Sequence, residues 1–128
     1  MIADNHVKNG KIFIWKGKFA VLKSKKPFPL AFANIKDKSE TTVILDQSKI
    51  NGCKNIIKME KGWKLLTFDM VLPFGAVGFL AKISKAMAEE NIGIMAISSF
   101  STDHILVKAK DLDKAIKKLG SLGMAIKE

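Results

Sequence analysis

The clearest pattern of hydrophobic and polar positions lies in the second half of the chain. Apolar and other residues alternate along 63–72, and a period of two is typical of a strand with one apolar face. Farther along, Leu80, Ile83 and Met87 recur at helical spacing, with lysines and glutamates between them. The pattern therefore predicts a strand over 63–72, followed by an amphipathic helix that begins at residue 76 or 77.

The remainder of this half predicts four more elements. Residues 94–99 form a short apolar strand, and residues 104–110 alternate cleanly as a second one. Asp111 is a plausible N-cap for a helix whose apolar positions run to Leu119, and 124–127 can add a last strand. The order strand, helix, strand, strand, helix, strand is typical of a ferredoxin-like α+β fold, with both helices on one face of an antiparallel sheet.

The first half predicts strands and no long amphipathic helix. Its strand-like segments are 11–15, 18–23, 32–35, 41–45 and 56–59. Because a sheet without helices cannot bury its apolar face alone, we expect this half to pack with the second as one structural unit.

The charged residues limit the classes of molecule that this chain is expected to bind. The chain of 128 residues carries a net charge of +10, and all 22 basic residues are lysines. Arginine is the usual reader of guanine edges and the usual bidentate clamp on phosphate, so its absence argues against specific nucleic-acid recognition. A soluble, lysine-rich surface is the simplest interpretation, and weak binding to polyanions at low salt is the alternative.

Composition excludes several other classes. No uncharged run approaches the roughly 18 residues of a membrane helix, and the first residues lack the pattern of a signal peptide. The single cysteine, Cys53, cannot form an internal disulfide, so we expect a cytoplasmic protein without a membrane partner. One cysteine and two histidines argue against a zinc site, and no catalytic set or cofactor fingerprint is present. We therefore expect no enzyme activity, no metal and no cofactor.

Three segments of the second half resemble the ACT domain family. Residues 72–83 resemble its first strand-to-helix passage, and 91–94 resemble the entry to its second strand. Residues 97–107 resemble the signature I-S-T-x-x-T-D-[YF]-I-L-V of small bacterial tandem-ACT proteins and the related CASTOR arginine sensors. Here Ser99 replaces the usual threonine, Phe100 the usual tyrosine, and His104 an aromatic residue.

The first half fits the same subgroup at 17–21, 40–43 and 62–64. The resemblance thus implies tandem ACT-like halves packed together, with a degenerate ACT-like half over 1–60 and an ACT domain over 61–128. It also implies regulation rather than catalysis, because ACT domains commonly bind an amino acid and change an attached enzyme or partner. This chain would be a stand-alone ligand sensor, or a subunit that regulates an enzyme in trans, and its small, apolar halves lead us to expect a homodimer.

The candidate ligand site joins two segments, and we expect it between the halves or at a dimer contact. A free amino acid offers a carboxylate, which suits the N–H groups at a helix start, and an ammonium, which suits Asp103. Glycines permit close backbone approach, and hydroxyls add hydrogen bonds. The candidate ligand-binding residues are Phe74, Gly75, Ala76, Val77, Gly78, Ser98, Ser99, Thr102 and Asp103.

Each of these features also has a purely structural interpretation. The glycines can shape a turn, Asp103 can cap one, and the hydroxyls can satisfy nearby backbone groups. His104 is more simply a residue on the sheet surface than a ligand to a metal. If all the structural interpretations hold, the chain is a protein-interaction or oligomerisation module that has kept the ACT fold without a ligand.

Overall fold

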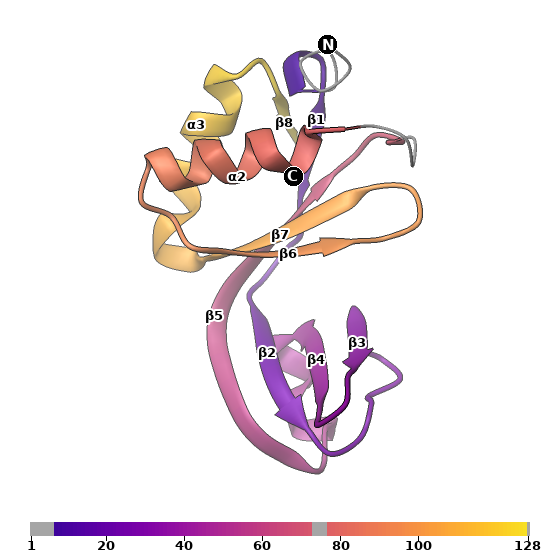
Figure 1. Ribbon diagram of the computed structural model, residues 1–128. Helices are drawn as coiled ribbons and strands as arrows, with labels where there is room; N and C mark the ends of the chain where they lie inside the picture. Colours follow the sequence, from indigo (N-terminus) through magenta and orange to yellow (C-terminus); the bar gives the residue numbers. More distant parts are fainter. Residues whose placement is uncertain (1–6, 73–76, 128) are drawn as a thin grey trace. The chain divides into compact units, whose positions relative to one another are not determined.

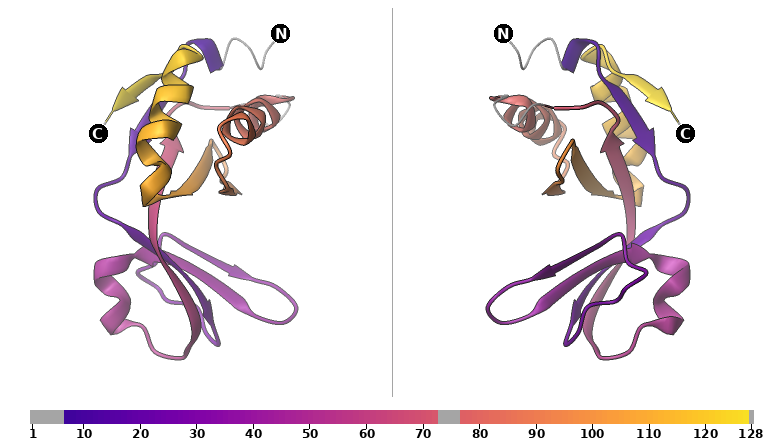
Figure 2. Two further views of the ribbon diagram at one scale, coloured as in Figure 1. Left: turned by 90° about the vertical axis from the view of Figure 1, so that its left-hand side faces the viewer. Right: turned by 90° about the vertical axis from the view of Figure 1, so that its right-hand side faces the viewer.

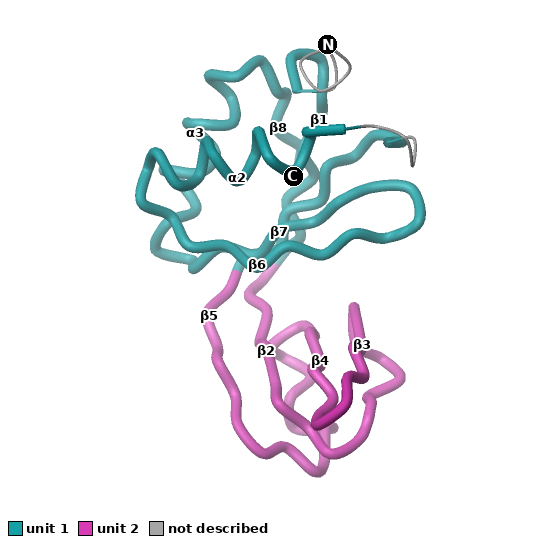
Figure 3. The backbone as a smooth tube through the Cα atoms, viewed as in Figure 1, with its two compact units in different colours: residues 1–16, 64–128 teal, residues 17–63 magenta. Residues whose placement is uncertain are grey.

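The computed structural model describes residues 7–72 and 77–127. The chain forms two compact units, which Figure 3 colours separately: unit 1 contains residues 1–16 and 64–128, and unit 2 contains residues 17–63. Strand β5 (Ile56–Phe68) begins in unit 2 and ends in unit 1. Among the described residues, no helix combines the length and apolar character needed to cross a membrane.

Unit 1 contains a sheet of five strands in the order β8–β1–β5–β7–β6. Strand β1 runs antiparallel to β5, with Ile12 opposite Phe68, and parallel to β8, while β6 and β7 form an antiparallel hairpin. The strands other than β5 are β1 (Lys11–Ile14), β6 (Ile94–Ser98), β7 (Asp103–Lys108) and β8 (Ala125–Lys127).

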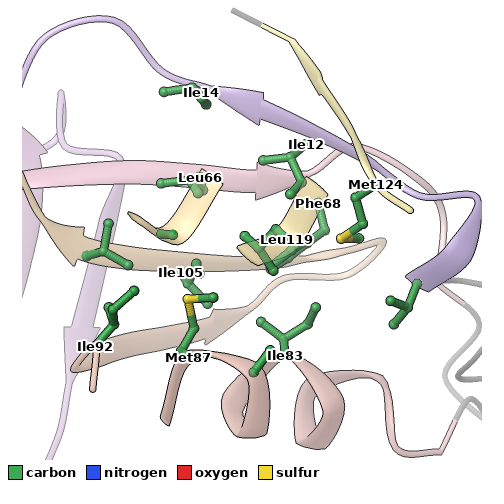
Figure 4. Packing of buried hydrophobic residues seen from close by; sticks show 14 of the residues in the cluster. Ile12, Ile14, Leu66, Phe68, Ile83, Met87, Ile92, Ile105, Leu119 and Met124 are labelled. Atoms are coloured by element: carbon green, nitrogen blue, oxygen red, sulfur yellow. The ribbon is translucent and has the colours of Figure 1, made fainter. Parts of the chain in front are cut away.

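Two helices, α2 (Phe79–Glu89) and α3 (Leu112–Ser121), pack on one face of this sheet. Figure 4 shows Ile83 and Met87 of α2 pointing toward the strands, and Leu119 of α3 enters the same cluster. The strands contribute every second residue to this cluster: Ile12, Ile14, Leu66, Phe68, Ile105 and Val107. The period-two pattern of the strands therefore places one apolar face against the apolar stripes of both helices.

Unit 2 consists of antiparallel strands. They lie in the order β3–β4–β2–β5, and a 3-10 helix, η1 (Gln47–Gly52), follows β4. Its described residues, which cover the whole unit, form no α-helix. The strands are β2 (Phe19–Ser24), β3 (Ala33–Lys36) and β4 (Thr41–Asp46) besides β5. Its own small core is built on Ala20, Leu22, Val43, Leu45 and Cys53.

The fold class expected from the sequence is confirmed. The chain is an α+β protein, and β5–α2–β6–β7–α3–β8 follows the predicted ferredoxin-like order (Figures 1 and 2). An additional feature is β1, which lies between β5 and β8 within unit 1. Residues 1–16 thus group with residues 64–128 in unit 1. Local patterning predicts that such a segment is a strand, but it does not specify which strands pair with it.

Candidate functional site

Unit 1 contains an open groove of about 640 Å³. It lies between the start of α2 and the turn that joins β6 to β7, two segments that Figure 1 shows in red and orange. All of the described lining residues belong to unit 1. They are Leu72, Gly78, Phe79, Leu80, Ala81, Ser98, Ser99, Phe100, Ser101, Thr102 and Asp103.

The groove brings together five of the nine candidate residues predicted from the sequence. Gly78 comes from the first segment, and Ser98, Ser99, Thr102 and Asp103 come from the second. Val77 is not among the lining residues, and 77% of its surface is exposed. The other three candidates, Phe74, Gly75 and Ala76, lie outside the described residues.

The first segment ends in a helix start without a side-chain cap. Gly78 is the N-cap residue of α2, and its φ of 89° is a left-handed value that favours glycine. Its carbonyl accepts the first helical hydrogen bond, from the Lys82 N–H at 3.0 Å. Glycine has no side chain to accept from the first N–H groups, and no cap hydrogen bond from a side chain is made at this helix start among the described residues, so the positive end of the helix dipole lies beside the groove.

The second segment is a tight turn fixed by its own hydroxyls. The backbone N–H of Ser99 donates to the Thr102 carbonyl at 2.8 Å, and the Ser99 hydroxyl donates to the same oxygen at 2.9 Å. The Thr102 hydroxyl donates to the carbonyl of Phe68 on β5. Both hydroxyl protons are therefore used within the protein, so these two side chains can meet a ligand only as acceptors.

One buried residue that the sequence interpretation placed on the sheet surface is His104. Only 7% of its surface is exposed, and both ring nitrogens are hydrogen bonded: Nδ1 to the Thr67 hydroxyl at 2.8 Å and Nε2 to the Ser99 hydroxyl at 2.9 Å. Burial lowers the pKa of the ring, and the charge of neighbouring Asp103 opposes this effect only partly. The sequence did contain a signal, namely a polar residue at 67 between Leu66 and Phe68, and another at 104 directly before the apolar run that starts at Ile105.

Large apolar side chains lie near the groove and in it. Phe100 lines it with 80% of its surface exposed, and Val71 and Val77, also more than three-quarters exposed, adjoin the lining residues Leu72 and Gly78 in the chain. Asp103 is the one charged residue among the described lining residues. The groove thus combines apolar walls, a helix start and a single carboxylate.

A metal site is not indicated in the part of the chain that the structure describes. No three His, Cys, Asp or Glu side chains lie close enough together there to hold an ion. The thiol of Cys53 is buried in unit 2, and burial raises its pKa, which makes it a poor nucleophile.

Comparison with solved structures shows which proteins share this fold. The chain matches a structure from Agobacterium tumefaciens, protein Atu0741, at 20% identity with a TM-score of 0.79, covering 93% of this chain and 92% of that one. It matches protein VC0802 from Vibrio cholerae, described as a possible transport protein, at 19% identity with a TM-score of 0.75, covering 94% of each chain.

A third similar structure has a stated regulatory role. It is the regulatory subunit of aspartate kinase from Thermus thermophilus, at 10% identity with a TM-score of 0.67, covering 88% of this chain and 97% of that one. No curated protein sequence matches the chain. The sequence model of the ACT domain matches residues 58–121, which is half of the chain and includes the described lining of the groove. This protein therefore belongs to the ACT domain family.

Proposed function

We propose that this protein is a non-catalytic regulator that binds a free amino acid in the groove of unit 1. The observation that carries the proposal is the position of the groove, which has the uncapped start of α2 at one side and Asp103 at the other. These two features are complementary to the two charges that every free amino acid carries.

The two charged ends of the ligand find different partners. The backbone N–H groups at the start of α2 accommodate a carboxylate, because the helix dipole and the free donors both favour negative charge. The Asp103 carboxylate accepts from the ammonium in a charge-assisted hydrogen bond, which is stronger than a neutral one. The acceptor lone pairs of Ser99 and Thr102 can take further ammonium protons.

The groove favours an apolar side chain on the ligand. Among its described lining residues there is no cation to pair with a second carboxylate, and Asp103 is already used by the ammonium. The four residues before Val77 are also uncharged in the sequence. A guanidinium would lack its own carboxylate here, so we propose that the similarity to tandem-ACT arginine sensors extends to the organisation of the chain and not to arginine as the ligand.

Regulation in this proposal requires a second molecule that responds to the ligand-bound protein. We propose that the protein acts in the cytoplasm as a homodimer and regulates an enzyme in trans, with unit 2 as a degenerate ACT-like half. The likeness to a separate regulatory subunit of aspartate kinase supports this arrangement through the shared fold.

The test is a ligand screen followed by one substitution. L-Leucine, L-methionine and L-phenylalanine should raise the melting temperature, and L-arginine and L-aspartate should do so less. At a hundred times the Kd, a ligand stabilises by about 2.7 kcal/mol. In isothermal titration calorimetry, Asp103→Asn should then weaken binding by roughly ten- to a hundred-fold, since a hydrogen bond to a charged group contributes about 1.5–3 kcal/mol.

Asp113→Asn is the matched control, because Asp113 lies in the first turn of α3 and not in the groove. It should leave affinity unchanged. Equal binding by wild type and Asp103→Asn would show that Asp103 is only a turn residue, and the proposed site would be wrong.

A second candidate function is a protein-interaction or oligomerisation module. It is favoured by the exposure of Phe100, Val71 and Val77, which are large apolar side chains in or next to the segments that line the groove. In that case no amino acid would stabilise the protein, and Phe100→Ser would shift the oligomeric state in light scattering.

A further inference from the structure

Four side chains of unit 1 form a chain of hydrogen bonds that ends at the groove. The indole Nε1–H of Trp15, the residue that follows β1, donates to the Thr67 hydroxyl on β5 at 2.7 Å. Thr67 bonds to Nδ1 of His104 on β7 at 2.8 Å, and Nε2 of His104 bonds to the Ser99 hydroxyl at 2.9 Å. The chain thus crosses three strands and reaches the turn between β6 and β7.

The partners at each end determine where the protons lie. The Ser99 hydroxyl has one proton, which it donates to the Thr102 carbonyl, so Nε2 of His104 must be the donor toward Ser99. At the other end, Thr67 already receives the Trp15 N–H, and its own proton is free to be donated to Nδ1. All the bonds are therefore satisfied together by a neutral ring with its proton on Nε2.

A second proton on the ring would disrupt this series. Nδ1–H would then point at the Thr67 oxygen, which already faces the indole N–H, and the Thr67 proton would lose its acceptor. An unsatisfied polar group in a buried position is costly. The lowered pKa of His104 agrees with this geometry, since burial disfavours the charged ring.

We propose that His104 is a positioning residue, which as a neutral ring holds the turn at Ser99–Thr102 against β5 and so fixes one wall of the groove. Ser99 and Thr102 line the groove, and Asp103 lies between Thr102 and His104 in the chain. Protonation of His104 leaves its bond to Ser99 in place but removes the acceptor of the Thr67 proton, which weakens the link from the turn to β5, so ligand affinity falls as the pH decreases. The effect on affinity rests on the proposed function, whereas the effect on the turn does not.

The charged groups on the strands around the ring include one carboxylate and three ammonium groups. Asp103 on β7 raises the affinity of the ring for a proton, against the effect of burial. Lys64 on β5 donates from its ammonium to the Trp15 carbonyl at 3.2 Å, at the far end of the series. Lys108 is the last residue of β7, and Lys127 on β8 lies opposite Phe13 on β1. Of these groups, Asp103 has the strongest effect on the titration, because it is next to the ring.

The first experiment follows the turn without any ligand. Amide hydrogen exchange of Ser99, whose N–H donates to Thr102, reports whether the turn stays closed. Thr67→Val removes the proton donated to Nδ1 at nearly constant shape, and His104→Phe removes both ring nitrogens. Each should accelerate exchange at Ser99 about five- to ten-fold at pH 7.5, the loss of roughly one net hydrogen bond.

The control is Val107→Ala, because Val107 is buried on the same strand but faces the helices. It should lower stability without a selective effect at Ser99. Two outcomes would show that His104 does not position the turn. In one, Val107→Ala accelerates Ser99 exchange as much as Thr67→Val does at equal loss of stability. In the other, neither Thr67→Val nor His104→Phe changes Ser99 exchange.

The second experiment measures affinity for L-leucine, L-methionine and L-phenylalanine between pH 7.5 and pH 5.5. Wild-type affinity should fall toward pH 5.5, and His104→Gln, which cannot be protonated, should be weaker at pH 7.5 and nearly independent of pH. His6→Gln, which changes the other histidine in the sequence, should keep the wild-type profile.

The outcomes separate the two proposals. If none of the three amino acids binds wild type while Ser99 exchange responds as expected, the proposed function fails and the role of His104 in the turn stands. If one binds with the same pH profile in wild type and His104→Gln, the proposed function stands and the pH-dependent role of His104 is wrong.

Discussion

Units 1 and 2 use different means of burying a sheet face. In unit 1, two amphipathic helices pack on the strands, and large side chains such as Phe68, Ile83 and Leu119 are fully buried in one cluster. In unit 2, no α-helix is present in the described residues, and a smaller cluster combines Leu22 and Leu45 with smaller side chains such as Ala20 and Val43. Unit 2 also leaves Leu30, Ile57 and Met59 exposed, each with more than two-fifths of its surface accessible.

The difference shows how much a covering helix contributes to a small sheet. Each helix in unit 1 adds an apolar stripe that interdigitates with every second strand residue, and this removes large side chains from water. Unit 2 has only the loop around Phe28 and Ala31 and the 3-10 helix carrying Ile50 to cover its cluster. The candidate ligand groove lies in the unit with the helices, because a helix start forms one of its walls.

The largest expected loss of stability comes from truncating a core leucine, and the two units should differ in its size. Leu119→Ala in unit 1 should cost about 4–5 kcal/mol, because the side chain is fully buried in the large cluster to which both helices and the strands contribute, and such a cluster collapses little into a cavity. Leu45→Ala in unit 2 should cost about 2–3 kcal/mol, since its smaller cluster is covered by loops that can move inward. Urea unfolding of both variants measures the difference, and equal losses would contradict the contrast drawn between the two cores.

The next largest loss of stability is expected on replacing two glycines that have a positive φ. In unit 1, Gly123 has a φ of 99°, and a Cβ there would lie 2.7 Å from the carbonyl oxygen of Lys8. In unit 2, Gly62 has a φ of 82° and no atom within 4 Å of such a Cβ. Gly62→Ala should therefore cost about 1–2 kcal/mol from backbone strain alone. Gly123→Ala should cost about 2–4 kcal/mol, because the close packing adds a clash. Thermal unfolding that ranks the two variants in the opposite order would show that backbone strain outweighs packing.

Lowering the pH should reduce the folding stability of the two units in different pH ranges. The lowered pKa of His104 means that the unfolded chain binds a proton more readily than unit 1 does, so unit 1 loses stability as the pH falls through the range around and below 6.5. In unit 2, hydrogen bonds from Ser48 lower the pKa of Asp46, so that stabilisation persists until the pH falls to about 4 and below.

The check is the melting temperature from pH 7.5 to pH 3.5. His104→Gln should flatten the upper part of this profile, and Asp46→Asn should flatten only the lower part. A wild-type profile that is flat between pH 7 and pH 5 would contradict the role given to His104.

The smallest effects come from one exposed ion pair in each unit. In unit 1, Lys118 of α3 lies 3.1 Å from Glu89 of α2, and in unit 2, Lys23 lies 3.4 Å from Glu40. Both pairs are partly exposed, so Glu89→Gln and Glu40→Gln should each change stability by less than about 1 kcal/mol. Urea unfolding at low and high salt checks this prediction. If either variant loses more than about 1 kcal/mol of stability, solvent does not screen that ion pair as its surface exposure implies.

The sequence by itself determined the elements and their class. Strict alternation along 104–110 and the helical spacing of Leu80, Ile83 and Met87 are local patterns, and each corresponds to an observed element. The largest difference in boundaries lies in one place: the predicted strands 56–59 and 63–72 form a single strand, β5 (Ile56–Phe68), because Glu60 between them also pairs in the sheet. The candidate residues Gly78, Ser98, Ser99, Thr102 and Asp103 were also within reach of the sequence, through a motif rather than through spacing.

Only the tertiary structure decided which segments meet. The insertion of β1 between β5 and β8 depends on long-range pairing, which four residues of alternating pattern do not specify. The burial of His104 depends on Thr67, 37 positions earlier in the chain, and on the turn at Ser99, and no local period distinguishes a buried, doubly bonded ring from one on the sheet surface. Hydrophobic periodicity is a property of one segment, whereas strand order, hydrogen-bond direction and the shape of a groove are properties of segments brought together.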